Sequence, residues 1–184
     1  MSEHLIALYG EQEVGRLAYA NDQLSFSYHE SWRENHAAFP LSLSMPLTAA
    51  SHPDKIVRPF ISGLLPDNAQ ILAAWGKRFQ VSPRNPYRLL SHVGEECAGA
   101  IQFLTPERLD SLPPTDTEPQ VTWLSESDLI ERIDALVADH SKARRLGDQG
   151  QFSLAGAQPK TGLYYDSENN RWGIPHGHTP TTHI

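Results

Sequence analysis

The sequence has little cysteine and no long apolar run, and both absences narrow what the protein can be. Cys97 is the only cysteine among 184 residues, which excludes an internal disulfide framework and suits a reducing compartment such as the cytoplasm. No apolar stretch approaches the roughly 20 residues of a membrane-spanning helix, and the polar start at residues 1–4 is unlike a secretory signal. We therefore expect a cytoplasmic protein without a membrane segment.

Positive charge is also scarce. The chain carries 15 Lys and Arg against 22 Asp and Glu, a formal net charge of −7. Because affinity for a nucleic-acid backbone comes from Lys and Arg, this balance argues against a free-standing, non-specific nucleic-acid binder. The length predicts one domain, or one domain plus part of another, since domains typically hold about 100–200 residues. A chain of this size buries enough apolar surface to fold without a disulfide or a metal.

The first 47 residues predict an antiparallel β meander. Apolar and polar residues alternate in short runs that stop at turn-forming residues, and Leu24, Phe26 and Tyr28 share one face of the clearest run. The expected strands are residues 4–9, 14–19, 24–28 and 41–45, the last of them ended by Pro46.

Helical spacing replaces this alternation in the middle of the chain. Helices are expected over residues 56–65, 69–79 and 86–90, followed by a strand over 98–104 that returns to the sheet. The segment 106–120, rich in proline, serine, threonine and acidic residues, is the predicted linker.

Beyond the linker, the sequence predicts a second unit with one helix and several short strands. Residues 125–128 fit a helix cap, after which apolar residues mark one face of an amphipathic helix: Leu129, Ile130, Ile133, Leu136 and Val137. Strands are expected near 153–154, 162–165, 171–174 and 181–184. The predicted fold is α+β, with a subdomain over 1–105, a linker over 106–120 and a second unit over 121–184.

The stretch 153–161 is the most suggestive for chemistry. The small residues Ala155, Gly156 and Ala157 let the backbone approach a ligand, and backbone N–H groups there can face an anion beside the charge of Lys160. A small-residue turn between two strands is similar to the loop that covers the ATP phosphates in kinases, although it lacks the Walker A spacing. Residue types alone leave a second interpretation open and favoured, a tight hairpin with one exposed lysine.

Two other features receive structural interpretations. His176, His178 and His183 are close in sequence, but no cysteine or helical histidine spacing accompanies them, so we predict a solvated turn without a metal. Cys97 follows Glu95 and Glu96, whose negative charge disfavours a thiolate. We therefore predict a small buried side chain at Cys97 rather than a nucleophile.

Five blocks, in the same order, resemble the N-terminal part of HipA proteins, bacterial serine/threonine kinases that act as toxins in toxin–antitoxin modules. The blocks are Pro40–Leu47 with Phe60–Asp67, Leu89–Gly94, Cys97–Phe103, Ser153–Thr161 and Pro180–Ile184. They span nearly the whole chain, which makes the resemblance specific. It favours the phosphate-loop interpretation of residues 153–161.

The resemblance implies roles for individual residues of this loop. In HipA proteins the loop covers the ATP phosphates, and its serine, here Ser153, is a site of inhibitory autophosphorylation. A phosphate on Ser153 would add roughly −2 charge where the ATP phosphates lie, which would eject the loop. Pro159 stands where many relatives carry an acidic residue and would stiffen the turn. The residues implied to bind ATP are Ala155, Gly156, Ala157, Gln158 and Lys160.

The resemblance also implies a longer parent kinase. Its chemistry needs a nucleotide-pairing lysine after the loop, a catalytic aspartate and Mg²⁺-binding Asn and Asp residues, and none of these motifs is matched here. In the family that lysine follows the segment matched by residues 180–184. We therefore expect residues 121–184 to be the beginning of a kinase-like N-lobe, and the 184 residues alone to transfer no phosphate.

For the parent, the resemblance implies ATP and Mg²⁺ as cofactors and a HipB-type DNA-binding antitoxin as partner, with operator DNA reached through the antitoxin complex. The implied substrate is a translation factor such as an aminoacyl-tRNA synthetase, and the implied outcome is growth arrest and persistence. A second interpretation is a non-catalytic binding module that neutralises a separately encoded HipA-like kinase, although such a module would not need the loop. An unrelated α+β domain is the remaining alternative.

Overall fold

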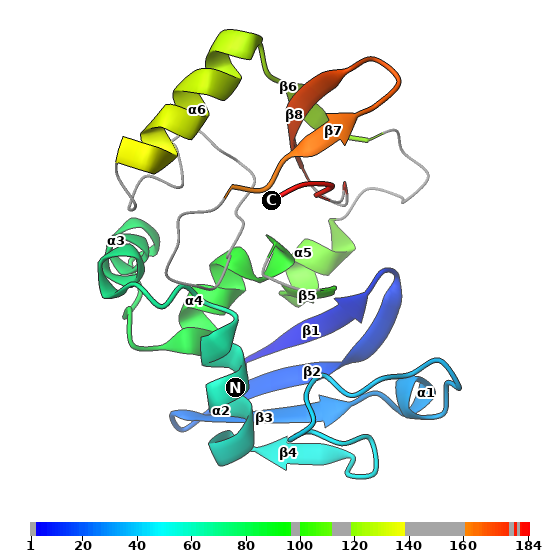
Figure 1. The fold of residues 1–184 in the computed structure, drawn as a ribbon. Helices are drawn as coiled ribbons and strands as arrows, with labels where there is room; N and C mark the ends of the chain where they lie inside the picture. Colours follow the sequence, from blue (N-terminus) through cyan, green and yellow to red (C-terminus); the bar gives the residue numbers. More distant parts are fainter. Residues whose placement is uncertain (1–2, 97–99, 112–118, 139–160, 177–178, 180) are drawn as a thin grey trace.

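The structure is a computed structural model that describes residues 3–96, 100–111, 119–138, 161–176, 179 and 181–184. Its strands form two antiparallel sheets, a five-stranded one in the order β4-β3-β2-β1-β5 and a three-stranded one in the order β6-β8-β7 (Figure 1). The fold is α+β, as the sequence predicted.

The larger unit holds the five-stranded sheet and most of the helices. Its strands are β1 (Glu3–Tyr9), β2 (Gln12–Ala20), β3 (Gln23–Tyr28), β4 (Ser51–Pro53) and β5 (Ile101–Leu104). Its helices are α1 (Glu30–Arg33), α2 (Asp54–Gly63), α3 (Ala69–Phe79), α4 (Pro86–Val93), the 3-10 turn η1 (Gly94–Glu96) and α5 (Pro106–Asp110). The predicted linker thus begins with a short helix.

The second unit contains β6 (Val121–Trp123), α6 (Glu126–Ala138), β7 (Tyr164–Asp166) and β8 (Arg171–Pro175). The predicted helix after residue 125 is confirmed, and so are the strands expected near 162–165 and 171–174. The segment 181–184 makes a single antiparallel bridge, between His183 and Leu163, rather than a strand.

Tight turns define the meander of β1, β2 and β3. Asn21 and Asp22 connect β2 to β3 with φ angles of 51° and 60°, the left-handed pair that fits a two-residue hairpin between right-twisted strands. Gly15 permits the close pairing of β2 with β3, because a Cβ at this position would lie 2.3 Å from the Ser27 carbonyl oxygen. The strands predicted over residues 4–9, 14–19 and 24–28 are confirmed as β1, β2 and β3.

The main core lies between the five-stranded sheet and the helices α2, α3 and α4. Alternation along β3 buries Leu24, Phe26 and Tyr28 on one face, as the sequence predicted. The helices supply Val57, Ile61, Trp75, Leu89, Leu90 and Val93 to the same cluster. On the opposite face of the sheet, a small cluster of Ile6, Leu8 and Leu104 packs against Leu109 of α5.

The predicted strand over residues 41–45 is wrong. This segment is a loop, and the short strand β4 pairs with β3 in its place. The buried Tyr28 hydroxyl donates a hydrogen bond to the Met45 carbonyl at 2.7 Å and accepts one from the Leu41 N–H at 2.8 Å. These two backbone groups therefore bond to a side chain instead of a neighbouring strand. Met45 is buried, whereas Leu43 points into solvent.

Among the residues that the structure covers, no helix is both long and apolar enough to cross a bilayer.

The loop that Tyr28 holds provides a test of this packing. Tyr28→Phe removes a buried hydroxyl and leaves the Leu41 N–H and the Met45 carbonyl without this partner. We expect the free energy of unfolding to fall by about 1–3 kcal/mol, as for other buried polar groups left unpaired. Urea denaturation followed by circular dichroism measures the change.

Tyr165→Phe is the control, because its hydroxyl donates to Asn170 at the exposed end of a hairpin. That variant should change the free energy of unfolding by no more than about 0.5 kcal/mol. An equally small effect of Tyr28→Phe would contradict the role of its hydroxyl.

Candidate functional site

The predicted phosphate loop lies outside the described residues. All of its predicted functional residues fall within 139–160, the longest stretch that the structure does not describe: Ser153, Ala155, Gly156, Ala157, Gln158 and Lys160. Cys97 and His178 also lie outside the described residues. The described chain resumes at Thr161, directly after Lys160. The structure therefore describes the residues that follow the predicted loop, and not the loop.

The exit strand, residues 161–165, leads into β7, and of these residues only Tyr164 and Tyr165 belong to β7. It is held by side chains and backbone from two directions. The Thr161 hydroxyl oxygen accepts a hydrogen bond from Arg132 Nε of α6 at 2.8 Å. Leu163 exchanges backbone hydrogen bonds with His183, its N–H donating at 2.9 Å and its carbonyl accepting at 3.0 Å. The Tyr165 N–H then donates to Thr182 Oγ1 at 2.7 Å. The first residues after the predicted loop are therefore fixed in place.

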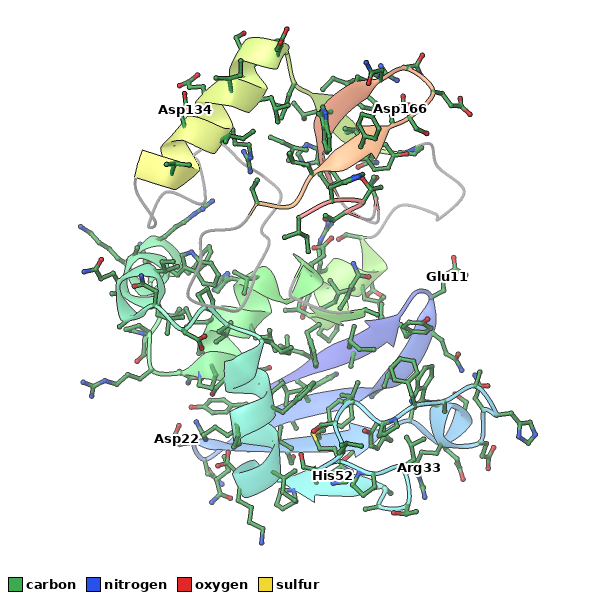
Figure 2. All side chains as sticks on the ribbon, in the orientation of Figure 1. Glu11, Asp22, Arg33, His52, Asp134 and Asp166 are labelled. Carbon is green, nitrogen blue, oxygen red and sulfur yellow. The ribbon has the colours of Figure 1, made fainter. Side chains whose placement is uncertain are left out.

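A network centred on Asp166 organises the turn that joins β7 to β8, labelled in Figure 2. The carboxylate accepts hydrogen bonds from the N–H groups of Glu168 and Asn169, from the Asn169 side-chain amide at 2.8 Å and from Arg171 Nε at 2.9 Å. The amide of Asn169, and then the guanidinium of Arg171, lower the pKa of the Asp166 carboxyl to about 2. The carboxylate stays ionised at neutral pH and holds the hairpin turn.

Aromatic side chains cover both faces of the three-stranded sheet. On one face the Arg171 guanidinium lies 3.6 Å from the centre of the Trp123 ring, a cation–π contact. On the other face Tyr165, Trp172 and His183 form a cluster with ring centroids 4.5–5.7 Å apart. This cluster joins β7 and β8 to the segment around His183.

Glycine is required at the centre of β8. A Cβ on Gly173 would lie 2.2 Å from Val121 Cγ1 and 2.9 Å from the Thr122 carbonyl oxygen, both on β6. The close approach of β6 to β8 therefore depends on this residue.

Helix α6 begins at a reciprocal capping interaction, as the sequence predicted. The Asp128 N–H donates to Ser125 Oγ at 3.2 Å, and the Ser125 N–H donates to Asp128 Oδ2 at 3.1 Å. The negative charge at this end also interacts favourably with the helix dipole. The helix that begins at this cap carries Arg132, the partner of Thr161.

His176 and His183, the two described histidines of the C-terminal segment, each have a hydrogen-bond partner. His176 Nε2 is 2.7 Å from Thr122 Oγ1, and His183 Nδ1 is 2.9 Å from Thr182 Oγ1. Within the described ranges, no three His, Cys, Asp or Glu side chains lie together in a metal-binding arrangement.

Arg132 and Thr182 are contacts of the exit strand that the sequence reasoning did not single out. A signal for Arg132 was present, since residues 129, 132 and 136 share one face of a helix and two of them are leucines. A lone arginine on such a face indicates a specific polar partner. Thr182 carries no comparable signal, because its partner, Tyr165, is 17 residues away in sequence.

Comparison with known proteins identifies the family. A family model described as the HipA N-terminal domain matches residues 5–104, more than half of the chain. This chain belongs to the HipA family. The portion that matches lies in the larger unit and runs from β1 to the end of β5, before α5.

Similar proteins extend the HipA relationship beyond this unit. A putative kinase, Y4mE, from Sinorhizobium fredii is 34% identical over 165 residues, 88% of this chain and 37% of that protein. The serine/threonine-protein kinase toxin HipA of Shewanella oneidensis is 27% identical over 180 residues, 95% of this chain and 38% of the toxin. The chain thus spans less than two fifths of the length of these HipA relatives.

A solved structure gives the same relationship. The complex of HipA, HipB and operator DNA from Shewanella oneidensis contains a chain that superposes with a TM-score of 0.70 at 26% identity. The match covers 97% of this chain and 39% of that one.

The Asp166 network predicts how the hairpin responds to acid. A carboxyl whose pKa is lowered on folding stabilises the fold above its unfolded pKa of about 3.9, and that stabilisation is lost as the pH falls through the folded value of about 2. We expect the Asp166 carboxyl to titrate near pH 2, well below an ordinary aspartate. Carbon-detected NMR of the side-chain carboxyl measures this titration.

Asp166→Asn is the matched control, because it keeps the size of the side chain and removes the titrating group. The hairpin resonances of this variant should lose their pH dependence between pH 4 and pH 2. A wild-type Asp166 that titrates near pH 4 would contradict the network.

Proposed function

We propose that this chain is the N-terminal portion of a HipA-type serine/threonine protein kinase, the toxin of a type II toxin–antitoxin module. The observation that carries the proposal is the extent of similarity to proteins named as kinases, 88% and 95% of this chain. That extent passes the end of the N-terminal domain match at residue 104 and includes the second unit. The similarity therefore extends into the part of the chain that holds the proposed phosphate loop.

We further propose that the loop binds ATP and that Ser153 is its inhibitory autophosphorylation site. ATP supplies the phosphoryl group, and the backbone N–H groups of the small residues 155–157 would face its phosphates with the charge of Lys160 beside them. The exit strand supports this role because it is tied to α6 and to residues 182–183. A phosphate-binding loop needs such a fixed flank, since positioning supplies most of the catalytic effect in phosphoryl transfer.

Magnesium would accompany ATP in the intact kinase. Its binding demands oxygen ligands in near-octahedral geometry, usually one or two carboxylates together with the phosphates. The proposed Mg²⁺ ligands and the catalytic aspartate belong to the remainder of the parent kinase.

The proposed partners follow from the structural relative. That structure contains HipA, HipB and operator DNA, so we propose a HipB-type DNA-binding antitoxin as the partner of this protein. The net charge of −7 supports contact with operator DNA through the antitoxin rather than through this chain. We propose a cytoplasmic translation factor, such as an aminoacyl-tRNA synthetase, as the substrate, with growth arrest and persistence as the consequence.

One observation favours the alternative of a binding module that neutralises a separate HipA-like kinase. The larger unit has its own buried core, and the family match, residues 5–104, lies within that unit. A module of this kind would bind a kinase without transferring phosphate.

Phosphorylation assays test the proposed activity. The product of the complete reading frame, incubated with radiolabelled ATP and Mg²⁺, should incorporate one phosphate at Ser153, located by intact-mass and peptide mass spectrometry. Ser153→Ala should abolish this incorporation, and Ser167→Ala, at an exposed turn serine, should leave it unchanged. A complete product that neither binds nor hydrolyses ATP would overturn the kinase proposal.

The isolated 184-residue chain should transfer no phosphate in the same assay, because it contains no sequence match to the catalytic aspartate or to the Mg²⁺-binding residues. Phosphate transfer by this chain would contradict the assignment of those residues to the remainder of the parent. If the chain instead lowers the activity of a HipA-like kinase added to it, the binding-module alternative gains support.

A further inference from the structure

Positive charge gathers in one part of this acidic chain. Residues 68–94, which contain α3, α4 and the turn between them, hold four Lys and Arg and no Asp or Glu. The whole chain has a net charge of −7, so the local excess of positive charge is offset elsewhere in the sequence. A surface with local charge of one sign attracts partners of the opposite sign.

Three of the four cations are exposed and available to a partner. Lys77, Arg78 and Arg84 form no ion pair with a carboxylate in the part of the chain that the structure describes. The fourth, Arg88, donates to Glu3 Oε1 at 3.0 Å and is neutralised there. We call Lys77, Arg78 and Arg84 the basic patch.

The helix dipole explains only part of the basic patch. Lys77 and Arg78 lie in the last turn of α3, where cations interact favourably with the carbonyl end of the helix. Arg84 lies beyond the helix, in the turn that leads to α4, so the dipole of α3 does not account for it.

The turn that carries Arg84 is held at both ends. At its start the Val81 N–H donates to the Gly76 carbonyl at 2.9 Å, and a Cβ on Gly76 would lie 2.8 Å from the Val81 carbonyl oxygen. At its end the Asn85 side-chain amide donates to the Tyr19 hydroxyl at 2.7 Å. The backbone at Arg84 is therefore fixed before any partner binds, which lowers the entropy cost of binding.

The neighbouring face of α3 leaves room for another chain. Ala73 and Ala74 are exposed and lie one turn before Lys77 and Arg78 on the same face of the helix. Figure 1 shows α3 at the edge of the larger unit, beside α4. Short alanine side chains allow a partner segment to approach closely, and the longer Lys and Arg side chains can reach its charged groups.

We propose that the basic patch is a docking surface for an acidic segment of a partner protein. An arginine side chain can donate two parallel hydrogen bonds to one carboxylate, and the patch offers two arginines. A protein segment fits better than a nucleic acid, because a long phosphate backbone would also meet the negative charge of the rest of the chain. A segment with a few carboxylates responds mainly to charges within about 8 Å, the screening length at physiological ionic strength.

This inference goes beyond the proposed kinase function and does not depend on it. The contact needs no ATP and no phosphoryl transfer, so binding can be measured apart from activity.

Fluorescence anisotropy with the full 184-residue chain tests the proposal. The probe is a short labelled peptide of Glu, Ala and Leu, and the same peptide with Gln in place of Glu is its neutral counterpart. The combination of Lys77→Gln and Arg84→Gln removes two charges of the basic patch. The combination of Lys55→Gln and Arg16→Gln is the matched control, because it removes one exposed lysine and one exposed arginine elsewhere in the larger unit.

We expect the wild type to bind the acidic peptide and not its neutral counterpart. The patch variant should bind the acidic peptide about five- to tenfold more weakly, as expected for the loss of two exposed ion pairs. The control variant should stay within about twofold of the wild type. Raising the salt concentration should reduce the difference between wild type and patch variant, because salt screens exposed charges. Circular dichroism checks that both variants are folded.

Three outcomes would overturn the docking role. The first is a wild type that does not bind the acidic peptide, or that binds the neutral peptide equally well. The second is a folded patch variant that binds as tightly as the wild type, or a control variant that is equally impaired. The third is a labelled DNA duplex that binds the wild type more tightly than the acidic peptide does and is lost in the patch variant, which would make the patch a nucleic-acid contact.

Discussion

Burial of strand β1 on both faces is the constraint on which the larger unit depends. Leu5 and Ala7 face the core beneath the helices, and Ile6 and Leu8 face α5. Each of these larger apolar side chains stabilises the fold by about 1.5–3 kcal/mol when fully buried. A strand with two buried faces also needs two paired edges, which β2 and β5 provide in antiparallel register. The return of β5 after four helices is therefore necessary to complete the sheet.

The second unit is built on a different principle. Its three-stranded sheet is small. Specific side-chain contacts hold this sheet together, whereas a buried core stabilises the larger unit. The Asp166 network holds the turn, Arg171 stacks on Trp123, and Gly173 permits the close approach of β6. Small sheets of this kind are marginal unless another element packs on them or specific side-chain contacts hold them. Here those contacts converge on the two strands that follow the proposed phosphate loop.

Much of this architecture could be predicted from sequence because its signals are local. The alternation of Leu24, Phe26 and Tyr28 and the cap formed by Ser125 and Asp128 depend only on neighbouring residues. The alternation around Leu43 is equally clear, yet it failed, because the Tyr28 hydroxyl takes the backbone groups that a strand would pair. Propensity at such a segment is overridden by a tertiary hydrogen bond that no local pattern reveals.

The candidate site was predictable to a smaller degree for the same reason. The small residues, Lys160 and the family resemblance predict the loop from the sequence. Residue types alone do not distinguish a phosphate loop from a tight hairpin. The physical difference between a phosphate loop and a tight hairpin lies in how the chain on either side of the loop is held. A hairpin tip needs only its own two strands, whereas a loop that must place backbone N–H groups against a charged ligand needs an end held independently of that ligand. The exit strand has such an end, because Arg132 reaches Thr161 from a separate helix and residues 182–183 bond to Leu163 and Tyr165. This restraint on residues 161–165 comes from elements distant in sequence, so no local pattern predicts it.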